Sequence, residues 1–432
     1  MLLPPRTRLL HIGPMKTGTT SVQAAARARR DVLLAHGVRY PGTAKMHRRH
    51  LGALMGFSVE TWRRAGELRP DLMDIDTAGI PSQKMWKDLR AEIDADTERR
   101  VFLTHEFVSQ ADDATAQRVI DGIGGQVHIC ITLRTPGQMI PSLWAQGLKD
   151  DAQTEPYLDW LNRFYGKDPE HPISGRYQRM CDQGQLVQRW ARLVGPENVT
   201  AIVVDSARPN QLTSALEAML GLPKATLEWK PTNRSLTAPE SELFRQVNLS
   251  LRERKASWST FDRLVFKGAI MRGAGPRDVP QDEARLMLPP WAAEQSMADG
   301  RRFAEDIRQS GVRVVGDLEV LAKEPRSGEW TPIDQVPSDL AGQVVAAAIV
   351  SGREWRDQWK RIADDRSAEL KKVKQELAEL KSRDFADQVR TIPANRRARE
   401  AATAFRTREL AAALRQRLQS TAGRRLRQAR RR

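Results

Sequence analysis

The segment with the clearest chemical potential is LLHIGPMKTGTTSVQ, residues 9–23. Leu9–Ile12 are apolar or nearly so and predict a buried strand, Gly13–Thr20 predict a turn, and the residues from Ser21 onward predict a helix. A turn in this position presents a run of backbone N–H groups at the start of a helix, where these groups and the helix dipole attract anions. Lys16 adds a positive charge inside the turn. The segment therefore predicts an anion-binding loop.

The spacing of the glycines helps to define the anion. Gly13 and Gly18 have the spacing of the nucleotide-binding P-loop, GxxxxGK[ST], but the residue after the second glycine is Thr19. The lysine instead stands within the loop, at Lys16. A phosphate-transferring kinase needs Mg²⁺ and positive charge spread over a polyphosphate. One lysine with several hydroxyl and N–H groups is better suited to a single phosphate, so a P-loop-like kinase is the alternative interpretation.

A second anion-binding pattern lies in ICITLRTPGQMIPSLWAQ, residues 129–146. Its apolar strand is followed by Arg134, whose guanidinium can donate two hydrogen bonds to one phosphate. Pro136 suits the first turn of a helix, whereas Pro141 predicts that this helix starts late or kinks. Taken alone, Arg134 would more often be a surface ion-pair residue. Its place after a buried strand, downstream of the first loop, instead favours a second anion site.

Residues 13–23, GPMKTGTTSVQ, resemble the 5′-phosphosulfate loop of sulfotransferases that use 3′-phosphoadenosine 5′-phosphosulfate (PAPS). The resemblance implies that Lys16 contacts the 5′-phosphate and the bridging oxygen of this co-substrate. It also implies that the phosphate is wrapped by a set of neighbouring loop residues, Gly13, Thr17, Gly18, Thr19 and Thr20. As the S–O bond breaks, negative charge grows on the bridging oxygen, so an ammonium placed there stabilises the transition state more than the ground state.

The second pattern resembles the 3′-phosphate element of the same family, in which an apolar strand is followed by R-x-P and by a serine eight residues after the arginine. This resemblance implies that Arg134 and Ser142 bind the 3′-phosphate. The segment TNRSL resembles a basic loop near the cofactor in many members, which makes Arg234 a candidate phosphate or adenine contact, with an exposed loop arginine as the alternative. Two anion sites match one co-substrate with two phosphate ends. The seven histidines and two cysteines show no metal-binding spacing, so no metal is expected.

Sulfuryl transfer requires that a carboxylate or an imidazole remove the acceptor's proton. FLTHEFVS, residues 102–109, supplies His105 and Glu106 at the end of an apolar run. Heparan-type N-sulfotransferase domains have a glutamate before the 3′-phosphate strand and cytosolic relatives use a histidine, so the resemblance favours Glu106 as the base, with His105 as second candidate. A Glu106 that caps a helix or pairs with a lysine is the alternative. Gln23 is expected to face the site, and His11 to be a hydrogen-bonded structural histidine.

Short apolar runs of strand length alternate with helical segments over the first half of the chain. These runs are Leu9–Ile12, Val101–Thr104, Val127–Leu133 and Val199–Val204. Their alternation with helices predicts a three-layer α/β fold, like that of P-loop nucleotide triphosphatases, with a mostly parallel sheet flanked by helices. Because ligands bind at the carboxyl ends of such strands, the joints after the first three runs are expected to form the site. Residues 1–325 are predicted to form this domain.

A C-terminal helical extension is predicted after residue 325. Residues 326–352 predict a polar linker and a short helix, and residues 353–384 predict a charged amphipathic helix. Apolar residues at spacings of three and four in the second segment suggest pairing as a short coiled coil, and so a homodimer. A solvated helix packed on its own domain is the alternative. Residues 385–432 form an Arg-rich basic tail.

This tail carries most of the excess charge. Fourteen arginines against three acidic residues give residues 386–432 a net charge of +11, out of +16 for the 432-residue chain. Such a tail predicts either peripheral contact with an anionic membrane surface or a disordered extension without a partner, and nucleic acid is not expected because no binding motif accompanies the charge. No apolar run reaches the roughly 18 residues of a membrane span, and no signal-peptide pattern is found. A cytoplasmic protein, peripheral to the inner face of the membrane, is therefore expected.

Together these features predict a PAPS-dependent sulfotransferase that acts on a hydroxyl or amine of a carbohydrate, a glycolipid or a small metabolite. No pattern in the sequence identifies the acceptor. The alternatives are a P-loop-like kinase and a non-catalytic basic adaptor, built on a degenerate sulfotransferase fold, that binds membrane or nucleic acid.

Overall fold

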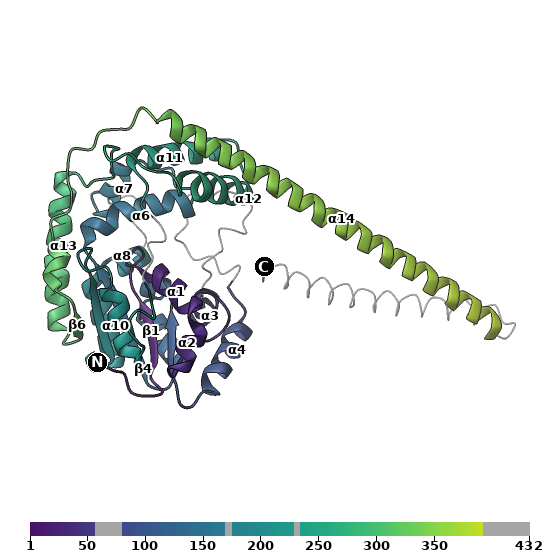
Figure 1. Cartoon of the computed structure of the whole chain (residues 1–432), viewed down its shortest axis with the longest axis horizontal. Coiled ribbons are helices and arrows are strands. Elements are labelled where there is room, and N and C mark those ends of the chain that lie inside the picture. Colours follow the sequence, from purple (N-terminus) through teal and green to yellow (C-terminus); the bar gives the residue numbers. More distant parts are fainter. Residues whose placement is uncertain (57–79, 169–174, 229–233, 392–432) are drawn as a thin grey trace. The chain divides into compact units, whose positions relative to one another are not determined.

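Within the described residues, six parallel strands form one sheet in the order β2-β3-β1-β4-β5-β6 (Figure 1). The strands are β1 (Arg8–Ile12), β2 (Val38–Arg39), β3 (Arg100–Thr104), β4 (Val127–Arg134), β5 (Val199–Val204) and β6 (Arg313–Val315). This computed structural model describes residues 1–56, 80–168, 175–228 and 234–391. The chain divides into two compact units, Met1–Glu354 and Trp355–Arg432, and the first of them contains the sheet.

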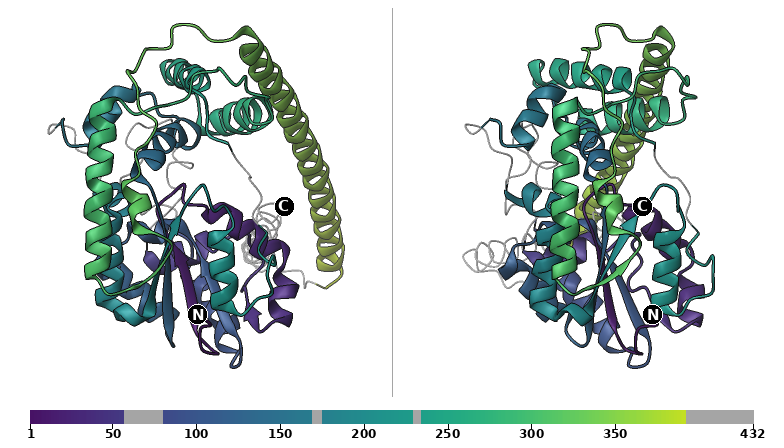
Figure 2. Two further views of the ribbon diagram at one scale, coloured as in Figure 1. Left: turned by 60° about the vertical axis from the view of Figure 1, so that its left-hand side comes forward. Right: turned by 90° about the vertical axis from the view of Figure 1, so that its left-hand side faces the viewer.

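Helices cover both faces of the sheet, which confirms the predicted three-layer α/β fold (Figures 1 and 2). The first face is covered by α3 (Arg48–Met55), α4 (Gln83–Asp94), α5 (Asp113–Ile123), α9 (Gln183–Val194) and α13 (Pro290–Gln309). The second face is covered by α1 (Thr19–Ala28), α2 (Arg30–Ala35) and α10 (Gln211–Leu220). Short 3₁₀ turns complete this part, namely η2 (Glu106–Gln110), η3 (Pro196–Asn198) and η5 (Leu318–Ala322).

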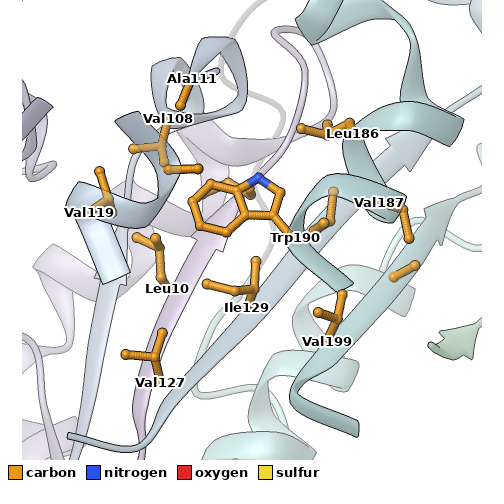
Figure 3. Packing of buried hydrophobic residues seen from close by; sticks show 14 of the residues in the cluster. Leu10, Val108, Ala111, Val119, Val127, Ile129, Leu186, Val187, Trp190 and Val199 are labelled. Atoms are coloured by element: carbon orange, nitrogen blue, oxygen red, sulfur yellow. The ribbon is translucent and has the colours of Figure 1, made fainter. Parts of the chain in front are cut away.

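Side chains of the central strands alternate between the two faces, as the pleat of a strand requires. Leu10 of β1 packs on the first face and Leu9 on the second, and both side chains are fully buried. Figure 3 shows the first of these cores, where Trp190 of α9 lies among aliphatic side chains such as Ile129 of β4. Strands buried on both faces have apolar runs in their sequence, which is why β1, β3, β4 and β5 were predictable.

A further group of helices shares a separate hydrophobic core, most of it beyond the carboxyl edge of the sheet (Figures 1 and 2). These are α6 (Pro136–Asp150), α7 (Tyr157–Phe164), α8 (Gly175–Cys181), α11 (Ala238–Glu253), α12 (Trp258–Thr260) and the π-helix η4 (Phe261–Ala274). Helix α6 begins at Pro136 and continues through Pro141, so the predicted late start of this helix is wrong. Pro141 removes one backbone N–H, yet dense burial along α6 holds the helix together.

The C-terminal part of the first unit contains the start of α14 (Ser338–Thr391). Leu340 and Val344 of its first turns are buried, and Asp339 forms an ion pair with Arg277 at 3.3 Å. The sequence predicts a short helix that ends at residue 352 and a separate charged helix from residue 353. In the structure one helix, α14, runs through both segments without an interruption.

The second unit, Trp355–Arg432, consists of the remainder of α14 and of residues 392–432, which lie outside the described residues and include most of the predicted basic tail. Trp359 and Leu370 of α14 are 52% and 54% exposed. Pairing of this helix with a second copy stays a prediction. None of the helices in the described part of the chain combines the length and the apolar character that a membrane crossing requires.

Candidate functional site

Three joints that the sequence singles out meet at one edge of the sheet. At the end of β1, His11 lies beside Thr104 of β3, and Ile12 lies beside Ile131 of β4. Because the three strands are parallel neighbours, the loop at residues 13–18, the residues after β3 and the start of α6 emerge together. This is where ligands bind in open parallel sheets, since the strand order reverses around β1.

The loop after β1 is tightly held against β4. A Cβ atom added to Gly13 would lie 2.2 Å from Oγ1 of Thr132 and 2.7 Å from its carbonyl oxygen, so only glycine fits there. Thr17 donates its hydroxyl to the carbonyl of Pro14 at 2.7 Å and lies 2.9 Å from Oγ1 of Thr132. The Thr17 side chain therefore braces the loop against β4.

Backbone conformations in the loop are also unusual. Lys16 has φ of +71° and Gly18 has φ of +93°, which places both in the left-handed region. Gly18 tolerates this region and precedes α1 as its N-cap residue, whereas a lysine adopts it only at a cost. Thr19 and Thr20 form the first turn of α1, and Thr19 is buried.

The ammonium group of Lys16 is partly buried, and other positive charges act on it. Its Nζ atom donates to Oε1 of Gln146, on α6, at 3.3 Å. The pKa of Lys16 is lowered to about 8, mainly by burial and also by the charges of Lys149 and Arg134, while the charge of Asp150 acts in the opposite direction. An anion that binds beside a lysine in such surroundings stabilises the charged form of the lysine and raises its pKa.

Arg134 touches the same loop. Its Nη1 atom donates to the carbonyl oxygen of Lys16 at 2.7 Å, and its Nη2 atom lies 3.5 Å from Oε1 of Gln138. Gln183 of α9 bonds to both the backbone N–H and the carbonyl of Arg134 at 2.8 Å, which fixes the end of β4. Burial lowers the pKa of Arg134, although an arginine stays charged. The structure thus brings the two predicted cations, Lys16 and Arg134, together.

Ser142 lies one turn along α6 from Gln138. Its hydroxyl donates to the carbonyl of Gln138 at 3.3 Å and is 3.4 Å from the hydroxyl of Ser235. Arg234 does not stand free in the solvent. It makes two hydrogen bonds to Glu240, at 2.6 and 2.5 Å, and a third to the carbonyl of Ala274. The guanidinium of Arg234 is therefore paired with the carboxylate of Glu240, and Arg234 directly precedes the serine that lies beside Ser142.

Glu106 and His105 differ in their access to solvent. The Glu106 side chain is 16% exposed, whereas the His105 side chain is fully buried. Oε2 of Glu106 accepts a hydrogen bond from Nε2 of Gln23 at 2.9 Å and lies 3.4 Å from Nδ1 of His105. Burial raises the pKa of Glu106, but its bond and charge interaction with His105 and its bond with Gln23 outweigh this, and the pKa falls to about 2. Glu106 is therefore an ionised, partly accessible carboxylate that Gln23 holds in place.

Several polar residues of the site were missed by sequence reasoning. Gln138, Gln146 and Lys149 lie on α6, and Gln183 begins α9. Gln138, Ser142, Gln146 and Lys149 follow one another at spacings of four, four and three, which is the pattern of one helix face. That polar stripe in an otherwise apolar helix was the available signal.

The buried histidines beside the site predict a steep loss of stability in acid. His47 accepts from the N–H of Thr104 through Nδ1 and bonds to the carbonyl of Pro41 through Nε2, both at 3.1 Å, so the neutral ring is the one that fits. Burial lowers the pKa of His47 to about 3 and that of His11 to about 4, from 6.5. The unfolded chain therefore binds more protons, and stability present above pH 6.5 is lost as the pH falls.

Between pH 6.5 and pH 5 each of these two histidines is expected to remove about 2 kcal/mol from the free energy of unfolding, or about 4 kcal/mol together. Urea unfolding at pH 7 and pH 5 measures this difference. A His47→Gln variant, which does not titrate, should lose about half of the pH dependence. Equal free energies of unfolding of the wild-type protein at the two pH values would contradict the assignment.

Comparisons with known proteins add two structural similarities. A sulfotransferase from Alicyclobacillus acidocaldarius aligns with a TM-score of 0.37 and 20% identity, over 57% of this chain and 94% of its own. A sulfotransferase domain from the curacin biosynthetic pathway aligns with a TM-score of 0.30 and 13% identity, over 52% of this chain and 77% of its own. No protein-family model and no curated protein sequence matches the chain. With TM-scores and identities this low, the two similarities carry no conclusion about activity, which has to be argued from the site.

Proposed function

We propose that this protein is a sulfotransferase that moves a sulfuryl group from PAPS to a hydroxyl or amine of an acceptor. The observation that carries the proposal is the bond from the Arg134 guanidinium to the carbonyl of Lys16. It brings two partly buried basic residues from separate elements together at the carboxyl edge of the sheet, next to the loop that leads into α1. A co-substrate with a phosphate at each end of one nucleoside suits such a pair.

In this proposal the protein supplies charge and position. Arg134 and Ser142 hold the 3′-phosphate, and the loop around Lys16 holds the 5′ end. A lone pair of the acceptor attacks sulfur, the bond between sulfur and the bridging oxygen breaks, and adenosine 3′,5′-bisphosphate leaves with the bond's electron pair. Lys16 stabilises the charge that grows on the bridging oxygen. The acceptor's proton passes to a base.

Glu106 is the better candidate for that base. Its carboxylate is ionised at neutral pH and partly open to solvent, whereas His105 is enclosed and lies against the same carboxylate. A carboxylate of low pKa is a weak base, but an attacking hydroxyl becomes strongly acidic as its oxygen bonds to sulfur, so a weak base suffices. Gln23 and His105 then act as positioning residues that hold the carboxylate in place.

Calorimetry with adenosine 3′,5′-bisphosphate tests the proposal without knowledge of the acceptor. The wild-type protein is expected to bind this nucleotide, and Lys16→Met and Arg134→Met are each expected to weaken binding about tenfold or more. Lys84 is an exposed lysine that forms an ion pair with Asp88. Lys84→Met is therefore the control variant and should bind the nucleotide as the wild type does. Absence of binding by the wild type, or tight binding of ATP with Mg²⁺ in its place, would reject the proposal and favour the kinase.

A further inference from the structure

One face of α6 follows the site from end to end. Arg134 meets Gln138 at its first turn, Ser142 meets Ser235 one turn later, and Gln146 accepts from Lys16 after another turn. Each residue advances a helix by about 1.5 Å, so these contacts follow one another along the axis of α6. The next residue on the same face is Lys149.

Lys149 is a lysine with little exposure to solvent. Lys149 is only 8% exposed, and its side chain forms no hydrogen bond or ion pair with any residue that the structure describes. The carboxylates of Asp150 and Glu240 and the guanidinium of Arg234 act on its charge, and both carboxylates have other hydrogen-bond partners. Asp150 accepts from the amide of Gln146 at 2.6 Å, and Glu240 bonds to Arg234.

A second ammonium whose charge acts on Lys16 is unfavourable in the absence of an anion. The charge of Lys149 acts directly on Lys16, and burial disfavours the charged form of both groups. Two like charges in poorly hydrated surroundings cost free energy, so the arrangement is expected where a ligand supplies negative charge. Lys149 lies about one turn along α6 beyond Gln146, the residue that contacts Lys16. This position indicates that Lys149 meets the part of the ligand that lies beyond the group bound by Lys16.

We propose that Lys149 binds the sulfonate group of the donor. This inference rests on the proposed function, in which the 5′ end of the donor lies at Lys16. The phosphosulfate carries one negative charge on phosphate and one on sulfonate, and the two ammonium groups match them. Lys149 takes no proton and no electron pair during transfer. It holds the sulfonate oxygens in place while the bond from sulfur to the bridging oxygen breaks and the acceptor's oxygen or nitrogen bonds to sulfur.

Calorimetry with two nucleotides tests this role, because PAPS has the sulfonate and adenosine 3′,5′-bisphosphate lacks it. For Lys149→Met, affinity for PAPS is expected to fall about tenfold and affinity for the bisphosphate less than about twofold. Retained binding of the bisphosphate also shows that the variant is folded. Lys16→Met should weaken the binding of both nucleotides, and the exposed control Lys84→Met should change neither.

Equal losses of affinity for the two nucleotides would overturn the inference, because Lys149 would then act on the part that they share. Unchanged affinity for both would also overturn it. A wild-type protein that binds neither nucleotide would instead reject the proposed function itself, so the two failures are distinguishable. Lys149→Arg, which keeps the positive charge, is expected to recover part of the affinity for PAPS and thereby to separate charge from packing.

Discussion

Lys16→Met is expected to lower kcat for sulfuryl transfer by about 10²–10³-fold, the size of effect seen when one preplaced stabilising group is removed from a developing charge. The reason is its place in the loop. The left-handed backbone at Lys16 and the contact with Gln146 hold the ammonium at the start of α1. Methionine keeps most of the length and apolar volume of the side chain but removes the charge, so the loss should fall on the transition state more than on binding.

The measurement is transfer of radiolabelled sulfate from PAPS into an acceptor fraction of cell extract that the wild-type protein modifies. A second signature comes from pH. Because the pKa of Lys16 is about 8 in the free protein, the ammonium is present below that pH, and kcat/KM for the donor should fall as the pH rises through about 8. Transfer by Lys16→Met at the wild-type rate, or a donor kcat/KM that keeps rising above pH 9 or so, would contradict this role.

Glu106→Gln is expected to lower kcat by about 10²–10⁴-fold, the range for loss of a general base. Glutamine has nearly the shape of glutamate and can still accept the bond from Gln23, so the site should keep its geometry while it loses its base. Binding of adenosine 3′,5′-bisphosphate is expected to stay within about twofold of the wild type. Because the pKa of Glu106 is about 2, its carboxylate stays ionised above about pH 3, and activity should not fall through its protonation in that range.

His105→Asn is the matched comparison for this variant. If Glu106 is the base, the asparagine variant retains part of its activity, because His105 acts only by holding the carboxylate. A much larger loss for His105→Asn than for Glu106→Gln would assign the proton transfer to the histidine. Full activity of Glu106→Gln would remove the carboxylate from the reaction altogether.

The fold was largely predictable because the central strands are buried on both faces. Apolar runs marked β1, β3, β4 and β5, while β2 (Val38–Arg39) and β6 (Arg313–Val315) were missed because two or three residues at the sheet's edges carry too little pattern. The continuity of α14 was missed for another reason. The change from small to charged residues near position 352 reads as a boundary, but nothing there interrupts helical hydrogen bonding.

The candidate site was predictable where short motifs carry its chemistry and less so where tertiary contacts do. Lys16, Arg134 and Glu106 follow strands of one sheet, so their convergence could be expected from topology alone. The clamp of Gln183 on the end of β4 joins elements 49 residues apart, and no local pattern reveals it. Similarly, the sequence marks Arg234 only as a basic loop residue, and its ion pair with Glu240 is visible only in the structure.

A crystal structure of the protein with adenosine 3′,5′-bisphosphate tests the central claim most directly. The account predicts one phosphate within hydrogen-bonding distance of Arg134 and Ser142, and the other at Lys16 and the N–H groups of the first turn of α1. A nucleotide bound away from this edge of the sheet, or one whose phosphates both avoid Arg134, would contradict it.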